Sequence, residues 1–332
     1  MLLRHGIFLL STVGLLSCAG LSTDLPEIAD LNLTQERRSQ VNTALQNRHE
    51  YLQRLATIAK PILTENAEIC PRLRPYYGLT THSAKSYSKH INEDASQIFD
   101  LTDDPRVLHV IADSPASTAG FQSGDIILDE NEKPLTASAL RKQDVPDNGQ
   151  KIVNVKRGED ILQLTVETIP ACDYNLRLSS SDTVNAYATG RSIIITTGMM
   201  DFTTRDEELA AIIGHELAHN TLAHIRKITT NLIVTGFATR YTRGFESEAD
   251  YVGLYYAARA GYDMQNVEDI WRRLGTRHPR NIGRAKTHPT TPDRFLRLKA
   301  AYDEIQSKRA AGQPLLPNFT SSTTTKPSAS KS

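Results

Sequence analysis

Apolar residues recur at helical spacing in three stretches of the chain. Residues 33–59 are predicted to form one amphipathic helix that ends before Pro61, because Glu and Arg side chains separate its apolar positions. Those positions are Val41, Leu45, Leu52, Leu55 and Ile58. Residues 207–223 and 246–258 carry apolar side chains on several faces, which is typical of helices buried in a core.

The segment between residues 76 and 168 has a different pattern, in which short apolar runs alternate with turn residues. Residues 107–111 are predicted to form a strand. Strand-like patterns at 152–155 and 161–166 flank the turn residues 157–160, so we expect a β-hairpin there. The chain as a whole therefore predicts an α+β fold.

The first 18 residues have the pattern of a secretory signal peptide. Arg4 precedes an apolar run over residues 7–16, which is too short to span a bilayer as a helix. The run ends in Leu15-Leu16-Ser17-Cys18, which resembles a bacterial lipobox, so Cys18 is the candidate lipid attachment site. The alternative is an ordinary signal peptide with an unmodified cysteine. Ala19 follows the cysteine, which favours the outer over the inner membrane for the anchor.

An exported protein folds in an oxidising compartment, where cysteines that carry no lipid commonly form disulfides. With Cys18 assigned to the anchor, Cys70 and Cys172 remain of the three cysteines. They bracket the β-rich segment, and a disulfide between them would close its base. Two buried free thiols are the alternative.

Charge and composition exclude several classes of protein. Lysine plus arginine and aspartate plus glutamate both total 38, so the net charge is zero and no nucleic-acid partner is expected. Hydrophobic residues make up 39% of the 332 residues, which is too low for a protein with several membrane spans. The final residues, from Lys308 onwards, are rich in Ser, Thr and Lys and are predicted to be disordered.

The strongest chemical signal is His215-Glu216-Leu217-Ala218-His219, within the second predicted helix. Residues four apart share one face of a helix, so His215 and His219 can direct both imidazoles at one metal ion. Glu216 lies about 100° further round the helix, where it can reach a water molecule on the metal. Two histidine ligands with a carboxylate as general base are the arrangement of zinc proteases, so one Zn²⁺ is predicted.

A catalytic zinc ion takes three protein ligands, and the third is expected from the downstream helix. Glu246 and Asp250 are four residues apart in the run Glu-Ser-Glu-Ala-Asp and share a face. We assign Glu246 to the metal and Asp250 to the orientation of a ligating imidazole. Glu248 points elsewhere on that helix, and His224 lies off the ligand face, so both are predicted to be structural.

The pair "HELAH" and "ESEAD", with the preceding "NAYATGRSIIITTGMM", resembles the HtpX-like zinc metallopeptidases, which include the CAAX prenyl proteases. The resemblance covers residues 173–301. It implies a mainly helical zincin-type domain of the gluzincin class (HExxH…ExxxD), in which Glu246 is the third zinc ligand. It also implies that residues 191–198 form an edge strand against which an extended substrate lies antiparallel.

The same resemblance extends to the segment 287–294, which contains His288 and matches an "HP…R" pattern. His288 is a candidate for stabilising the oxyanion or for occupying the open zinc position at rest. The alternative is that His288 and Pro289 cap and position a helix, while Arg294 makes a structural ion pair. Members of the family carry membrane-spanning helices, whereas residues 228–239 are too few to cross a bilayer. We expect a core helix or a lid near the cleft there, with contact to a membrane surface as the alternative.

Residues 107–128, "VLHVIADSPASTAGFQSGDIIL", resemble a PDZ domain of the type associated with bacterial proteases. Such domains bind an extended peptide or a C-terminus by adding it to a sheet edge, and a Gly-containing loop cradles the terminal carboxylate. Residues 76–79, Tyr-Tyr-Gly-Leu, are the candidate loop. Peptide capture is implied, and a structural or regulatory module is the alternative.

These patterns divide the chain into six segments: a lipoprotein signal peptide (1–18), a linker (19–32), an N-terminal helix (33–72), a PDZ-like domain (73–169), a zinc metallopeptidase domain (170–305) and a disordered tail (306–332). The predicted protein is a lipid-anchored, periplasm-facing zinc endopeptidase of the bacterial envelope. Its expected substrates are misfolded or unassembled envelope proteins that the PDZ-like module binds. The alternative is a lipid-anchored scaffold or holdase with a latent zinc site.

Overall fold

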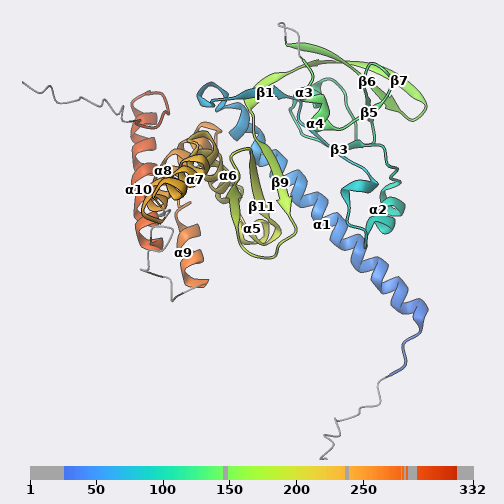
Figure 1. Ribbon diagram of the computed structural model, residues 1–332, viewed down its shortest axis with the longest axis horizontal. Helices are drawn as coiled ribbons and strands as arrows, with labels where there is room; N and C mark the ends of the chain where they lie inside the picture. The colour runs from blue at the N-terminus through green and yellow to red at the C-terminus, as the bar shows by residue number, and fades with distance from the viewer. Residues whose placement is uncertain are drawn as a thin grey trace, which may run out of the picture.

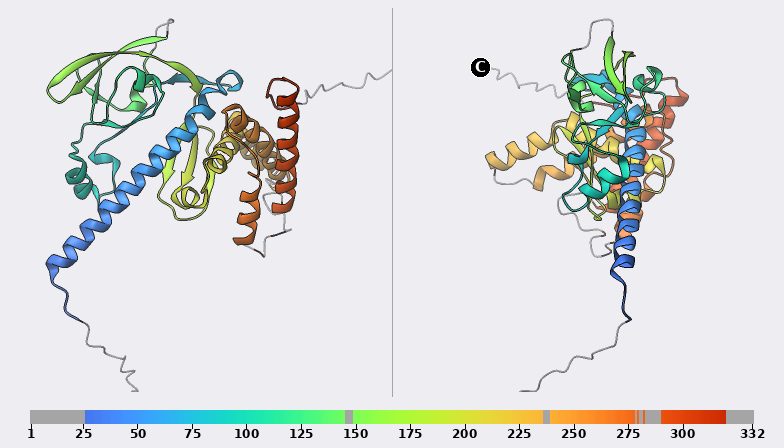
Figure 2. Two further views of the ribbon diagram at one scale, coloured as in Figure 1. Left: turned by 180° about the vertical axis from the view of Figure 1, so that it is seen from behind. Right: turned by 90° about the vertical axis from the view of Figure 1, so that its right-hand side faces the viewer.

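The computed structural model describes residues 26–144, 149–235, 239–277, 279, 282 and 290–319. Helix α1 (Asp30–Thr64) runs diagonally through the molecule, with a β-rich module on one side and a mainly helical part on the other (Figures 1 and 2). The described residues contain both helices and small sheets, with the strands between Leu73 and Thr196, which confirms the predicted α+β class.

Helix α1 is longer than the sequence predicts. It begins at Asp30 and continues through Pro61 to Thr64, although a proline inside a helix removes one backbone hydrogen bond. The last turn persists because Ile62 and Leu63 are buried in the core of the helical part. Burial of two large aliphatic side chains stabilises by about 3–6 kcal/mol, which offsets the lost bond.

The β-rich module has its own hydrophobic core. Strand β2 (Leu79–His82) pairs with β3 (Arg106–Val110). An antiparallel sheet has the order β5, β4, β6, β7. Its strands are β4 (Ile126–Leu128), β5 (Pro134–Leu135), β6 (Gln150–Arg157) and β7 (Asp160–Glu167), and the module's helices are α2 (Asn92–Phe99), α3 (Pro115–Thr118) and α4 (Ala137–Leu140). The predicted strand at 107–111 and the predicted hairpin are confirmed as β3 and β6–β7.

Both ends of the module meet at its base. Strand β1 (Leu73–Tyr76) pairs antiparallel with β8 (Ile169–Cys172), so the chain enters and leaves the module side by side. Cys70 and Cys172 form a disulfide at this point, with their Cα atoms 5.5 Å apart and a sequence separation of 102. In the chain-entropy model, closing a loop of that length stabilises the fold by about 4–5 kcal/mol.

Side chains of the module also contact α1. His49 of α1 and His82 of β2 each place a ring nitrogen 2.8 Å from the Tyr87 hydroxyl. Burial lowers the pKa of both histidines to about 4, so the rings are neutral at neutral pH. Further along α1, Arg37 forms an ion pair with Asp94 of α2. The module is therefore held against α1 at several points along the helix.

The helical part surrounds a second core. A three-stranded sheet of β9 (Asn175–Ser179), β10 (Ala186–Ala188) and β11 (Ser192–Thr196) packs beside helices α5 (Thr197–Phe202), α6 (Asp206–Thr221), α7 (His224–Thr235), α8 (Thr239–Arg259), α9 (Asp269–Arg277) and α10 (Thr291–Ala310). The two predicted buried helices correspond to α6, which ends two residues earlier than predicted, and to part of α8. In the described residues, no helix combines the length and hydrophobicity needed to span a bilayer.

The sheet of the helical part corrects one prediction. Residues 191–198 are expected to form an edge strand, but β11, which lies within them, is central. It pairs antiparallel with β10 on one side and parallel with β9 on the other. The isoleucines of β11 include the buried Ile193 and Ile195, as suits a strand with neighbours on both edges. The three-residue strand β10 is the edge beside the helices.

The C-terminal tail is ordered further than predicted. Helix α10 runs past residue 306 to Ala310, because Ile305 is buried in the core. Residues 313–319 then fold back onto α8 and α10, where the Lys308 ammonium donates to the Leu316 carbonyl at 2.6 Å. The Asn318 backbone N–H donates to the Tyr251 hydroxyl at 3.0 Å. The rest of the predicted tail, and the signal peptide with Cys18, lie outside the described residues.

Candidate active site

Two glycines allow the close crossing of α6 and α8 on which the site depends. A Cβ atom on Gly214 would lie 2.3 Å from the Gly253 carbonyl oxygen, and one on Gly253 would lie 2.5 Å from the His215 backbone nitrogen. Only glycine fits at both positions, although glycine inside a helix is intrinsically unfavourable by about 1 kcal/mol. Sequence analysis missed this pair; its signal was a glycine within each of two apolar helices.

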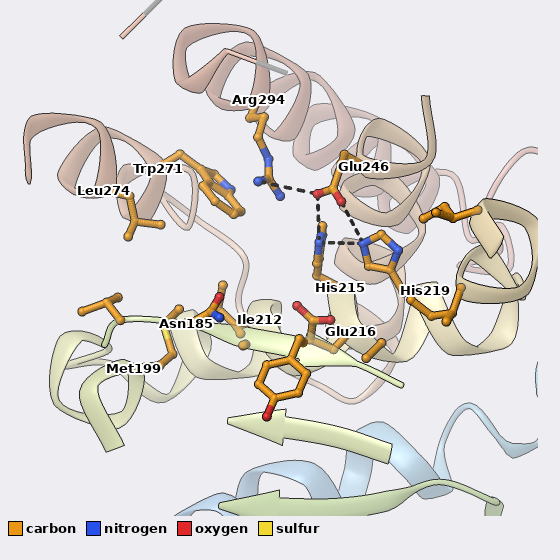
Figure 3. A pocket seen from close by; sticks show the side chains of 16 residues that line it. Asn185, Met199, Ile212, His215, Glu216, His219, Glu246, Trp271, Leu274 and Arg294 are labelled. Carbon is orange, nitrogen blue, oxygen red and sulfur yellow. Dashed lines mark hydrogen bonds and ion pairs between the residues drawn. The ribbon is translucent and has the colours of Figure 1, made fainter. Parts of the chain in front are cut away.

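His215 and His219 of α6 and Glu246 of α8 converge on one point (Figure 3). The two Nε2 atoms are 3.1 Å apart, and the Glu246 carboxylate oxygens lie 3.6 Å from Nε2 of His215 and 3.5 Å from Nε2 of His219. Two imidazole nitrogens and one carboxylate oxygen are the donors of a catalytic zinc site that keeps its fourth position open. The arrangement fits the predicted ligand set.

Asp250 and Arg294 lie directly behind this point. Oδ1 of Asp250 is 2.9 Å from Nδ1 of His215, on the opposite side of the ring from Glu246. Arg294 of α10 donates two hydrogen bonds to Asp250, at 2.7 and 2.6 Å. Burial alone would raise the pKa of Asp250, but Arg294 and His215 hold it below its usual value. The carboxylate is therefore charged, and its contact holds the His215 ring in orientation.

Arg294 also connects three helices around the site. It is only 5% exposed, and its guanidinium carbon lies 3.3 Å from the centre of the Trp271 ring of α9. One guanidinium nitrogen is 3.9 Å from Glu246. Sequence analysis considered a structural ion pair for this arginine but could not name its partner, because the partner lies on another helix.

Glu216 faces a cavity of about 350 Å³ that opens beside the three converging side chains (Figure 3). Burial raises the pKa of Glu216 to about 7, and the negative charge of Glu246 adds to the rise against the opposing charges of His215 and Arg294. A carboxylate that titrates near neutral pH suits proton transfer. The edge strand lines one wall of the cavity with Val184, Asn185, Ala186, Tyr187 and Ala188.

Asn220, one residue after His219, attaches α6 to the turn between β10 and β11. Its side-chain oxygen accepts a hydrogen bond from the Gly190 N–H at 2.6 Å, and its amide donates to the Ser192 carbonyl at 3.0 Å. This pair of bonds sets the edge strand beside the cavity. Sequence analysis missed Asn220, because an asparagine within a helix shows no local sign of what it will contact.

The remaining predicted residues have different outcomes. The predicted core helix or lid at 228–239 overlaps α7, whose Ile225 and Ile228 line the cavity. His224 was expected to be structural and to lie off the ligand face; in the structure its Nδ1 lies 3.1 Å from Nδ1 of His219. His288 lies outside the described residues.

Comparison with known families gives this geometry a context. Residues 159–235 and 225–302 match the model of peptidase family M48. The zinc-site region is M48-like. The matched ranges include the three converging side chains, Glu216 and the Asp250–Arg294 pair. They support the coarser part of the predicted resemblance, a zinc metallopeptidase, and do not distinguish its HtpX or CAAX subgroups.

The curated relatives that the chain matches are also described as metalloendopeptidases or proteases. The chain is 24% identical over 218 residues to the mitochondrial metalloendopeptidase OMA1 of Arabidopsis thaliana, which covers 56% of this chain and 45% of that protein. It is 23% identical to the Schizosaccharomyces pombe protein of the same name (44% and 53% covered) and 22% identical to the beta-barrel assembly-enhancing protease of Yersinia pestis (30% and 28% covered). The chain thus spans about half the length of its OMA1 relatives, and less of the third.

A solved structure is similar to part of the chain. The crystal structure of the HtrA3 PDZ domain bound to a phage-derived ligand covers 30% of this chain and 88% of its own, at 22% identity and a TM-score of 0.22. That score is too low to support an argument about the fold.

Proposed function

We propose that this protein is a zinc-dependent endopeptidase. The observation that carries the proposal is the convergence of His215, His219 and Glu246 next to Glu216 at the wall of one cavity. The match to M48 peptidases and the metalloendopeptidase relatives support it. A scaffold or holdase would not require a buried carboxylate beside the ligand set, so the enzyme is favoured over that alternative.

Among the described strands, β10 pairs only with β11, and its other edge offers a binding site for the substrate backbone next to Glu216. The Asn185 carbonyl accepts a hydrogen bond from the Thr196 N–H, and the Thr189 N–H donates one to the Ser192 carbonyl. In an antiparallel pair, the intervening Ala186 and Ala188 therefore direct their N–H and C=O groups away from β11. Both residues line the cavity. An extended chain can therefore add to β10, and recognition through backbone groups predicts broad sequence preference.

Glu216 acts on the reacting groups. Zinc, when bound, polarises the scissile carbonyl and makes water more acidic. Glu216 takes a proton from the attacking water and passes it to the leaving amine, so that one carboxylate serves first as base and then as acid. Asp250, held by Arg294, keeps the Nε2 atom of His215 directed at the ligand set.

Removal of the metal tests this proposal. A chain starting at Ala19, loaded with zinc, should cleave a permanently unfolded protein, and a chelator should abolish cleavage until zinc is restored. The apparent activity should fall by more than about 100-fold, because the three ligands alone supply no Lewis acid. Cleavage that persists after the metal has been removed, as shown by metal analysis, would contradict the proposal.

We further propose that the β-rich module, residues 73–169, is PDZ-like and binds the C-terminus of a polypeptide. A cavity of about 120 Å³ lies between the candidate loop and α1, and Arg141 lines it. Burial lowers the pKa of Arg141 to about 10, and the guanidinium has no ion-pair partner among the described residues. Among the described residues, the backbone N–H groups of Tyr77 and Gly78 also have no hydrogen-bond acceptor. A terminal carboxylate would satisfy all three groups.

The walls of this cavity indicate which side chain the C-terminal residue of the ligand should have. Leu63, Leu79, Ile111 and Leu176 line it, which suits a C-terminal residue with an apolar side chain. Gly78 has a φ of +80°, and a Cβ atom there would lie 2.1 Å from that of Ser114, so the loop conformation requires glycine. Strand β2, which follows, pairs only with β3 among the described strands and leaves one edge for the peptide.

Binding of matched peptides tests this site. A labelled peptide that ends in a free apolar residue should bind the full chain at least about 10-fold more tightly than the same peptide with an amidated C-terminus, since a hydrogen bond to a charged group contributes about 1.5–3 kcal/mol. Arg141→Gln should remove most of that difference, whereas Lys142→Gln, at the exposed neighbouring position, should not. Equal binding of acid and amide by the parent protein would refute C-terminal capture.

The proposed setting is the periplasmic side of a bacterial membrane, where Cys18 carries a lipid. The signal-like N-terminus and the disulfide at the base of the module support export to an oxidising compartment. Unfolded or unassembled envelope proteins are the proposed substrates, because they expose extended segments and free C-termini. Fractionation of cells that express the full chain tests the location, and recovery in the soluble fraction would contradict it.

A further inference from the structure

His224 is buried between a zinc-site histidine and a surface carboxylate. It is 0% exposed, at the start of α7, and its Nδ1 lies 3.1 Å from Nδ1 of His219. Its other ring nitrogen, Nε2, lies 3.0 Å from Oε2 of Glu248. The Phe245 ring stacks on the imidazole with centres 4.6 Å apart. The ring is thus held from three sides.

The tautomer of His219 determines where the hydrogen atoms lie in the contacts from His219 through His224 to Glu248. Nε2 of His219 faces His215 and Glu246, so it is the nitrogen available to a metal, and Nδ1 must carry the ring hydrogen. Nδ1 of His224 then accepts that hydrogen bond. Its own hydrogen consequently sits on Nε2 and is donated to Glu248. Each contact has one donor and one acceptor, with no conflict.

The two metal-facing histidines therefore have separate supports. Asp250 lies behind His215, at 2.9 Å, and His224 lies behind His219. Partners of this kind set the tautomer and ring orientation of a metal-binding histidine, and their loss commonly weakens metal binding 10- to 100-fold. Because His224 has no exposed surface, its contact with His219 is shielded from solvent.

We propose that His224 is a positioning residue that holds His219 in the tautomer and orientation required for zinc, with Glu248 setting the tautomer of His224 in turn. The inference rests on the proposed zinc site but not on peptide cleavage. It assigns to Glu248, which sequence analysis placed away from the site, a supporting contact. An apolar side chain of similar size could fill the same space but could not accept the hydrogen bond.

Two amide substitutions separate hydrogen bonding from packing. The side-chain amide of asparagine occupies nearly the place of Nδ1 of histidine, whereas that of glutamine lies nearer Nε2. His224→Asn can still accept from His219 and should bind zinc within about threefold of the parent. His224→Gln keeps a polar side chain but moves its oxygen away, and should bind zinc about 10- to 100-fold more weakly.

The measurement is the zinc dissociation constant of the full chain from Ala19, by competition with a chromophoric chelator. Phe245→Leu, which removes the stacking ring but leaves the hydrogen bonds, is the packing control and should change the constant less than threefold. Thermal unfolding in excess chelator should be similar for the asparagine and glutamine variants. Should either fail to fold, Glu248→Ala and Glu248→Gln provide the second comparison, in which only the alanine removes the acceptor and weakens zinc binding.

The possible results are decisive. Equal zinc affinity of the asparagine and glutamine variants, whether both are strong or both weak, would overturn the role of the Nδ1 acceptor. Stronger zinc binding by His224→Asn than by His224→Gln would support the role of His224 even if the parent protein cleaved no substrate. This inference and the proposed activity can therefore fail separately. A parent protein that binds no zinc would overturn both.

Discussion

Replacement of Glu216 by glutamine is expected to lower kcat/KM on an unfolded protein by about 1,000-fold while the protein keeps its zinc. Glutamine has nearly the same shape, but it is uncharged and cannot take a proton from the attacking water. Because Glu216 faces the cavity next to the ligand atoms and is not one of them, the metal should remain bound. We therefore expect the rate of peptide hydrolysis to fall without a loss of zinc binding.

The control for this variant is Glu207→Gln, the same change in the first turn of the same helix and outside the cavity. It should leave kcat/KM within about twofold of the parent. Zinc content, measured on the same samples, separates the explanations. Activity that survives in Glu216→Gln would exclude this residue as the base, and parallel loss of zinc and activity would assign it to the metal.

Replacement of Arg294 by methionine is expected to lower the free energy of unfolding by about 3–5 kcal/mol. Methionine fills much of the same volume against Trp271, but Asp250 would be left 4% exposed and without its two hydrogen bonds. Asp250 would keep its contact with His215, but a buried carboxylate that has lost its guanidinium partner is costly, so the native state loses stability. Asp250, which contacts the His215 ring, would no longer be held in place by Arg294, so zinc affinity should also fall.

Arg297→Met is the matched control, on the same helix α10 and one turn later. Arg297 is 59% exposed in its side chain and pairs with Asp293 at 3.0 Å, and such surface pairs contribute less than about 1 kcal/mol. Denaturant unfolding in the presence of a chelator compares the two variants without a contribution from zinc. The double variant Arg294→Met with Asp250→Leu should recover part of the loss, because the Asp250 charge is no longer buried without its arginine. Similar losses for Arg294→Met and Arg297→Met would contradict a buried structural pair.

Much of the candidate site could be predicted because its parts lie close together along the chain. The i, i+4 spacing places His215 and His219 on one face, and the same spacing does so for Glu246 and Asp250, whatever surrounds them. The β6–β7 hairpin could be predicted for the same reason, since its two strands are joined by a short turn. Local periodicity is enough to predict which residues share a helix face and which neighbouring strands form a hairpin.

Contacts between distant segments could not be predicted in this way. The edge strand was placed at β11 instead of β10, because strand order depends on which neighbours pair and not on the composition of one strand. His224 was assigned away from the ligands, because the direction of α7 after the end of α6 decides where its ring lies. Arg294 could be named as an ion-pair candidate, but not as the partner of Asp250.

By itself, the sequence determined the candidate chemistry: two histidines and a carboxylate at helical spacing, a second helix with a third candidate ligand, and a β-rich segment between two cysteines. Only the tertiary structure decided how these parts meet. Helices α6 and α8 approach closely because Gly214 and Gly253 have no side chains, and Asn220 sets strand β10 beside the cavity. The physical reason is that backbone periodicity determines which face a side chain occupies, whereas packing across the core determines what that face meets.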